Sequence, residues 1–106
     1  MVKVILLLYR RDGMSTEEFR RYAREHHAPL LLQLPGLTRL VINFPQPGPS
    51  GSPPICDAVA EDWFESIEAM GAAFGSPAGQ AVQADSANFL DMGKFQMMVV
   101  EEEAVK

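Results

Sequence analysis

Four short stretches of the chain have the apolar content and the alternation that predict β-strands. They are residues 2–9 (VKVILLLY), 37–44 (LTRLVINF), 55–64 (ICDAVAEDWF) and 94–101 (KFQMMVVE). They are rich in the β-branched, aliphatic and aromatic residues that suit a pleated surface. The first stretch is apolar on both faces in its middle, which predicts a strand that is covered on both sides.

A helix is predicted over residues 15–36. It begins with a capping box, in which Ser15 accepts a hydrogen bond from the amide of Glu18 and the Glu18 side chain reaches back. It ends at Pro35-Gly36, and Pro29 predicts a kink in between. The residues of its apolar face recur at a spacing of three or four, and they are Phe19, Tyr22, Ala23, His26, Leu30 and Leu34.

Two further helical segments follow the third strand. Ser66 caps the first, which ends at Gly75, and Ser76-Pro77 starts the second, which runs to Phe89. The resulting βαββαβ order predicts an α+β, ferredoxin-like sandwich: one domain over residues 1–106 with a four-stranded antiparallel sheet and helices on one face. Nothing in the chain is left to cover the other apolar face. We therefore expect a homodimer in which two sheets face each other as a dimeric α+β barrel.

Composition and charge limit the classes of function. The chain has 106 residues, 47% apolar content and a net charge of −5, which argue for one globular domain and against nucleic-acid binding. The early arginines form either a solvated helix face or a site for an anionic ligand. Cys56, as a single cysteine, suits a reducing compartment, and no apolar run reaches membrane length. We expect a cytoplasmic protein without membrane contact, metal site or bound cofactor.

The two histidines, His26 and His27, are the candidate chemical groups. Imidazole gains and loses protons near neutral pH, which suits acid or base catalysis. By helical period His26 lies within the apolar stripe and His27 about 100° further round, at the edge of the stripe. A structural interpretation stays open beside the chemical one, with His26 as a satisfied core residue and His27 as a surface residue.

Several longer pieces of the sequence resemble the EthD family of dimeric α+β-barrel proteins. The matching pieces are VILLLYRRDGMSTEEF, HAPLLLQLPGL, DAVAEDWFESIEAM and GSPAGQAVQADSANFLD, and the H-x-P run followed later by W-F-x-S is the more specific part. The resemblance implies a ferredoxin-like protomer, a homodimer and a pocket between sheet and helix. It also implies that His27 is the family's recurring histidine and that Asn43 matches its asparagine. The wider superfamily includes isomerases, cyclases, cofactor-independent monooxygenases and haem-degrading enzymes, so the fold does not select the chemistry.

Two hypotheses about function follow. In the first, the protein is a small enzyme of oxidoreductase or isomerase/cyclase type that acts on a hydrophobic organic compound, with His27 as the catalytic acid or base. The ligand pocket would be formed by His26, Asn43, Tyr9, Tyr22 and Trp63. We expect His27 and Asn43 to line one cavity, with His26 less exposed than His27. In the second, the protein is a non-catalytic ligand-binding or accessory protein of a degradation or biosynthesis pathway. Haem binding through one histidine is a weaker third possibility.

Overall fold

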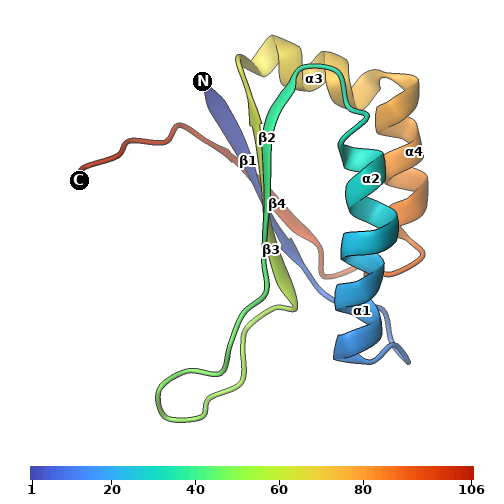
Figure 1. The fold of residues 1–106 in the computed structure, drawn as a ribbon, viewed down its shortest axis with the longest axis vertical. Coiled ribbons are helices and arrows are strands. Elements are labelled where there is room, and N and C mark those ends of the chain that lie inside the picture. The colour runs from blue at the N-terminus through green and yellow to red at the C-terminus, as the bar shows by residue number, and fades with distance from the viewer.

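The computed structural model, which describes residues 1–106, places four strands in one antiparallel sheet and the helices on one of its faces (Figure 1). The strands have the order β2-β3-β1-β4, so β2 and β4 form the edges. The α+β, ferredoxin-like fold is confirmed. The elements are β1 (Val2–Leu8), α1 (Thr16–Tyr22), the π-helical turn η1 (Ala23–His27), α2 (Ala28–Leu31), β2 (Leu37–Asn43), β3 (Ala58–Phe64), α3 (Ile67–Gly75), α4 (Pro77–Ser86) and β4 (Gln96–Val100).

The third predicted strand begins three residues later than expected, at Ala58. Asp57 lies just before the strand, where its carboxylate accepts the backbone N–H of Arg10 at 2.8 Å and its own N–H donates to the carbonyl of Leu8 at 2.8 Å. The Pro-rich stretch between β2 and β3 extends away from the sheet as a long loop (Figure 1). None of the helices is both long and apolar enough to cross a membrane.

The helix that carries the histidines starts as predicted and then departs from a regular α-helix. The Ser15 hydroxyl accepts the Glu18 N–H at 3.1 Å and donates to the Glu18 carboxylate at 3.1 Å, so the capping box closes through the hydroxyl. The predicted irregularity takes the form of the wide turn η1, in which the Ala28 N–H donates to the carbonyl of Ala23. Pro29, which has no N–H to donate, follows directly.

The π-helical turn reverses the expected exposure of the two histidines. The buried residues of this helix are Phe19, Ala23, His27 and Leu31, which recur every four residues. In a regular α-helix, side chains four residues apart are rotated by about 40° relative to each other around the helix axis. The wider turn of η1 compensates for this rotation. His27 is therefore buried, at 7% exposure, and His26 is exposed. The prediction that His26 lies in the apolar stripe and is the less exposed histidine is wrong.

The core between sheet and helices consists of two apolar clusters. One contains Leu8, Phe19, Ala23, Ala58, Ala60, Phe89 and Leu90, and the other contains Val4, Leu31, Leu34, Phe64, Ala73 and Val82. The chain's three buried polar residues are His27, Asp62 and Ser86, and each lies along the sequence between a residue of one cluster and a residue of the other. We call these three residues the polar seam.

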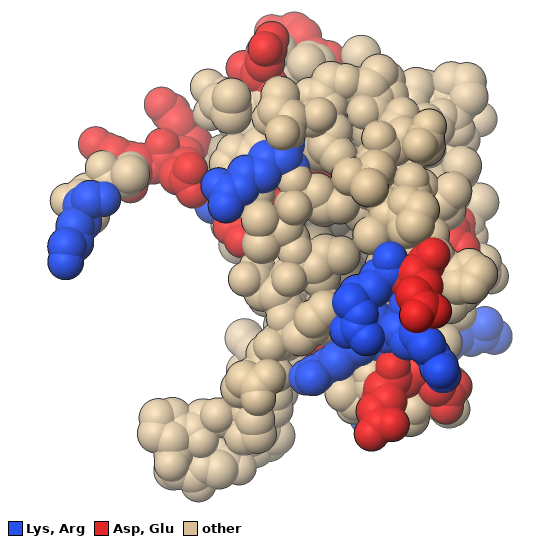
Figure 2. Space-filling model, in the orientation of Figure 1, with Lys and Arg blue, Asp and Glu red and all other residues tan.

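The other face of the sheet carries no helix, and we call it the open face (Figure 1). Ile5, Leu7, Asn43, Glu61 and Trp63 belong to it, because they alternate with the strand residues that point to the helices. Lys3 lies over the Trp63 ring and donates to Glu61 at 2.8 Å. Figure 2 shows this side of the molecule in profile, as a concave outline between the C-terminal tail and the Pro-rich loop, with charged side chains toward the tail.

Candidate functional site

His27 of the polar seam meets an aspartate from another helix. Nδ1 of His27, at the end of η1, lies 2.9 Å from Oδ2 of Asp85, in the last turn of α4. The Tyr22 hydroxyl donates to Oδ1 of Asp85 at 2.5 Å, and the Asn88 amide donates to the same oxygen at 3.1 Å. One carboxylate therefore orients an imidazole, a phenol and an amide.

The electrostatics of this pair favour a neutral imidazole beside an ionised carboxylate. Burial lowers the pKa of His27, and its hydrogen bond to Asp85 opposes the shift without reversing it. For Asp85, burial alone would raise the pKa, but hydrogen bonds from Tyr22, His27 and Asn88 outweigh it and the net shift is downward. We therefore assign the imidazole proton to Nδ1, where it is donated to the carboxylate, which leaves the lone pair of Nε2 available as a base.

Aromatic rings pack on the histidine side of this pair. The centroid of Phe89 lies 4.7 Å from that of His27 and 5.0 Å from that of Tyr22. Tyr22 also stacks on the exposed His26 at 4.8 Å. The hydrogen bond to Asp85 raises the pKa of Tyr22, so its hydroxyl remains a donor at neutral pH. The arrangement has the parts of a proton-transfer site in a largely apolar setting.

The structure separates the candidate residues into two groups. His27, Tyr22 and His26 lie together, as just described. Asn43 and Trp63 lie on the open face, where Asn43 donates to the carbonyl of Val59 and to Glu61, each at 3.0 Å. The expectation that His27 and Asn43 line one cavity is wrong for a single protomer, because the sheet lies between them. Tyr9 follows β1, and its carbonyl accepts the Asp91 N–H at 2.7 Å, apart from the histidine pair.

Two functional candidates, Asp85 and Asp62, were not singled out from the sequence. Asp85 falls on the apolar face predicted for residues 77–89, and Asp62 falls on the inward face of the alternating third strand. In both cases the signal in the sequence was an acidic residue at a position that faces the core, because acidic residues are seldom buried without a partner. What the sequence lacked was the partner, since His27 is 58 residues from Asp85.

Asp62 is the less usual of these two aspartates. Its side chain is fully buried, with 1% exposure, and neither carboxylate oxygen has a hydrogen-bond partner. Burial raises the pKa of Asp62 to about 7. No group of three or more histidine, cysteine, aspartate or glutamate side chains lies close enough together to hold a metal ion.

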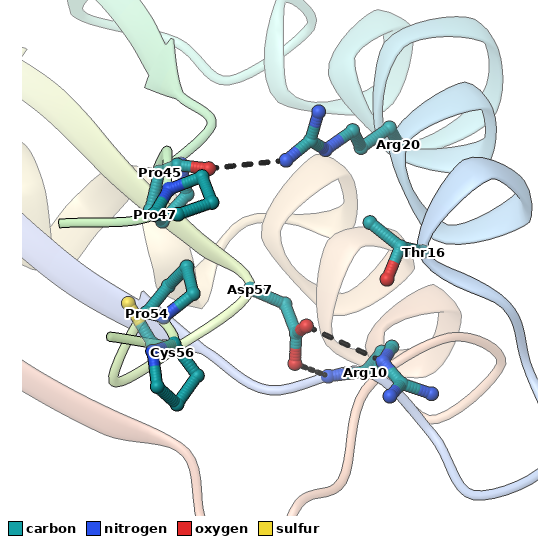
Figure 3. Close-up of a pocket in the computed structure, with 9 residues that line it drawn as sticks. Arg10, Thr16, Arg20, Pro45, Pro47, Pro54, Cys56 and Asp57 are labelled. Atoms are coloured by element: carbon teal, nitrogen blue, oxygen red, sulfur yellow. Dashed lines mark hydrogen bonds and ion pairs between the residues drawn. The ribbon is translucent and has the colours of Figure 1, made fainter. Parts of the chain in front are cut away.

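The surface has two hollows of note, and His27 lines neither. One, of about 430 Å³, lies at Leu7, Gln96, Met97 and Met98. The other, of about 340 Å³, lies between α1 and the Pro-rich loop and is lined by Arg10, Thr16, Arg20, Pro45, Pro47, Pro53, Pro54, Cys56 and Asp57 (Figure 3). Arg10 is paired there with Asp57, and Arg20 donates to the carbonyl of Pro45 at 3.1 Å. The guanidinium of Arg10 is thus already engaged in an ion pair within the chain.

Comparison with known proteins identifies relatives along most of the chain. A family model described as the EthD domain matches residues 11–93. An uncharacterized 11.0 kDa protein from the thcB-thcC intergenic region of Rhodococcus erythropolis is 37% identical over 87 residues, which cover 82% of either chain. The crystal structure of an EthD family protein from Bacillus halodurans has a TM-score of 0.83 at 26% identity and covers 97% of this chain and 99% of that one.

More distant structures share the fold. A dimeric ferredoxin-like protein of unknown function from Thermobifida fusca has a TM-score of 0.72 at 14% identity and covers 95% of this chain and 90% of that one. SnoaB from Streptomyces nogalater, a cofactor-independent oxygenase, has a TM-score of 0.70 at 13% identity and covers 98% of this chain and 94% of that one. At these identities the likeness concerns architecture alone.

Proposed function

This chain belongs to the EthD domain family, and from that premise we propose that it is a small-molecule enzyme in which His27 transfers a proton to or from a hydrophobic organic compound. The hydrogen bond between His27 and Asp85 carries the proposal. It holds the imidazole in the tautomer that leaves Nε2 free as a base, and a well-placed general base contributes typically ~10²–10⁴-fold to rate.

The compound would bind between sheet and helices, where apolar clusters flank the polar seam. The His27 side chain is 9% exposed, so a ligand reaches Nε2 only when neighbouring side chains move. The exposed ring of His26, stacked on Tyr22, is at the surface beside it. Oxidoreductase and isomerase/cyclase chemistry both fit a positioned base in an apolar site, and the cofactor-independent oxygenase with this fold is consistent with the first.

We also propose that the protein is a homodimer that covers its open face with a second copy. Support comes from the structural relative described as dimeric and from Met98 on the edge strand β4, which pairs with Ile5 of the open face and is 52% exposed. A second sheet placed over this face would bury roughly 1,200–2,000 Å² in total. Asn43 and Trp63 would then lie at the interface between the subunits.

The test is a turnover screen with aromatic lactones, quinols and polyketide-like acids, followed by two single substitutions. His27→Gln keeps the size and one hydrogen bond of the side chain but transfers no proton, so turnover should fall by roughly 10²-fold or more. His26→Gln is the matched control, because the neighbouring histidine is exposed and lacks the contact to Asp85. Full turnover by His27→Gln would refute the proton-transfer role. Ligand binding without any turnover would favour the non-catalytic, accessory function instead.

A further inference from the structure

The buried carboxyl of Asp62 has no partner within the chain. Its cross-strand neighbours are Val4 on β1 and Leu40 on β2, and Ala60 and Phe64 flank it on the same face of β3. These neighbours offer neither a counter-charge nor a hydrogen-bonding side chain. Buried polar groups in folded proteins are nearly always paired, so an orphaned carboxyl calls for a partner from outside the chain. An ionised carboxylate in this setting would be costly, which leaves the neutral acid as the favoured form.

Asp62 lies at the boundary between the two apolar clusters. On β3 it lies between Ala60 of the first cluster and Phe64 of the second. On the helical side, His27 stands between Ala23 and Leu31, and Ser86 stands between Phe89 and Val82. Leu6 of β1, which pairs with Ala60, packs against both clusters. The buried polar residue of the sheet and the two from the helical side therefore all fall at the boundary between the two clusters.

We propose that Asp62 is a hydrogen-bond-donating subsite of the polar seam and that it selects ligands with a neutral carbonyl oxygen over carboxylates. A protonated carboxyl has one O–H to donate. Ser86 does not compete for this role, because its hydroxyl already donates to the carbonyl of Val82 at 2.9 Å. A carboxylate ligand would be excluded since no cation in the seam compensates its burial.

This inference rests on the proposed function in one respect, that the polar seam around His27 admits a ligand. It then names the substrate class as ketones or aldehydes. When Nε2 of His27 takes the proton from a carbon next to the carbonyl, the C–H electron pair forms a carbon–carbon double bond and the carbonyl π pair moves to oxygen. The hydrogen bond from Asp62 stabilises the negative charge on that oxygen, a use of a neutral acid known from other proton-transfer enzymes.

Three probe molecules of similar shape test whether binding depends on a neutral carbonyl oxygen. Acetophenone has a neutral carbonyl, ethylbenzene has no acceptor and benzoate is a carboxylate. Binding of each is followed by NMR at the His27 imidazole, which reports occupation of the polar seam. In parallel, the infrared C=O band of the protonated carboxyl is recorded below pH 7, because burial raises the pKa of Asp62 to about that value. The band should be lost in Asp62→Asn and retained in Asp57→Asn, an ion-paired aspartate outside the seam.

In the unmodified protein acetophenone should shift the Asp62 band and bind roughly tenfold more tightly than ethylbenzene, and benzoate should bind more weakly than either. Asp62→Asn retains an amide donor and should keep most of the preference for the ketone. Asp62→Leu, similar in shape but without a donor, should lose that preference. Because only the ratio between probes is compared, a general change in stability does not imitate the result.

Each outcome decides between the two proposals. If the probes shift the His27 signals while Asp62→Leu keeps the preference for acetophenone, the subsite is refuted and the site at His27 stands. If benzoate binds as well as acetophenone, the predicted selectivity is refuted. If no probe reaches His27 or the Asp62 band, both the subsite and the proposed ligand site are refuted. If the Asp62 band responds but His27→Gln retains full turnover of the screened substrates, the subsite stands and the proton-transfer role does not.

Discussion

Nδ1 of His27 lies 2.9 Å from Oδ2 of Asp85, although 58 residues separate them along the chain. The contact depends on η1, because the π-helical turn brings His27 rather than His26 to the side that faces α4. π-helical turns within α-helices occur frequently at functional sites. Here the local departure from regular helix and the candidate chemistry concern the same residue.

We expect Asp85→Asn to change the tautomer of His27. The carboxylate favours the proton on Nδ1, whereas an amide can donate to Nδ1 as well as accept from it. Nitrogen NMR of the imidazole should show an Nδ1–H tautomer in the unmodified protein and a mixture or the Nε2–H tautomer in the variant. Turnover should fall with it, because the base at Nε2 is then occupied by a proton. Tyr22→Phe removes a different hydrogen bond to Asp85 and should leave the tautomer unchanged.

The pH dependence of activity should show an acidic limb set by His27. Burial lowers the pKa of His27 from its ordinary value of 6.5, so the base remains unprotonated to a lower pH than a free imidazole does. We expect kcat/KM to fall on the acid side with a midpoint below 6.5. A profile with a midpoint above 6.5 would contradict the burial of this ring in the active protein.

The sequence determined the architecture better than the site. The strands, the Ser15 cap and the βαββαβ order follow from periodicity and turn chemistry, which are local. The exposure of the two histidines was predicted wrongly because one wide turn changes the phase of a helix and leaves little signal in the periodicity. The pairing of His27 with Asp85 and the isolation of Asp62 depend on packing between elements, which no local pattern specifies. Asn43 was placed by the family resemblance, and the sheet separates it from His27 within a protomer.

Met98→Glu should convert the proposed dimer into a monomer. Met98 is 52% exposed and pairs with Ile5 beside the open face, so a charge there would be buried by the second copy. Light scattering at micromolar concentration should show a dimeric mass for the unmodified protein and a monomeric mass for the variant. Met92→Glu is the control, because Met92 is 50% exposed but lies outside the strands. A monomeric mass for the unmodified protein would refute the dimer itself.

Asp62 should make the folded protein less stable as the pH rises toward neutrality. In the unfolded chain the carboxyl ionises at its ordinary pKa of 3.8, whereas burial raises the pKa of Asp62 in the folded protein to about 7. Below 3.8 the carboxyl is protonated in both states and its contribution to stability is fully present. As the pH rises through about 7 that contribution is lost, since the unfolded state releases the proton first.

The size of this effect and its separation from other titrations follow from the same two values. At about 1.4 kcal/mol per pKa unit, the shift corresponds to roughly 4 kcal/mol of unfolding free energy. His27 contributes the opposite trend, because its lowered pKa makes the protein less stable as the pH falls below 6.5.

The useful quantity is therefore the difference in unfolding free energy between Asp62→Asn and the unmodified protein, measured by denaturant titration across the pH range. That difference should increase in favour of the variant between pH 3.8 and about 7 and then level off. Asp62→Leu should show the same rise, because it also lacks the titrating group, and a constant difference in both variants would mean that Asp62 is not held as the neutral acid.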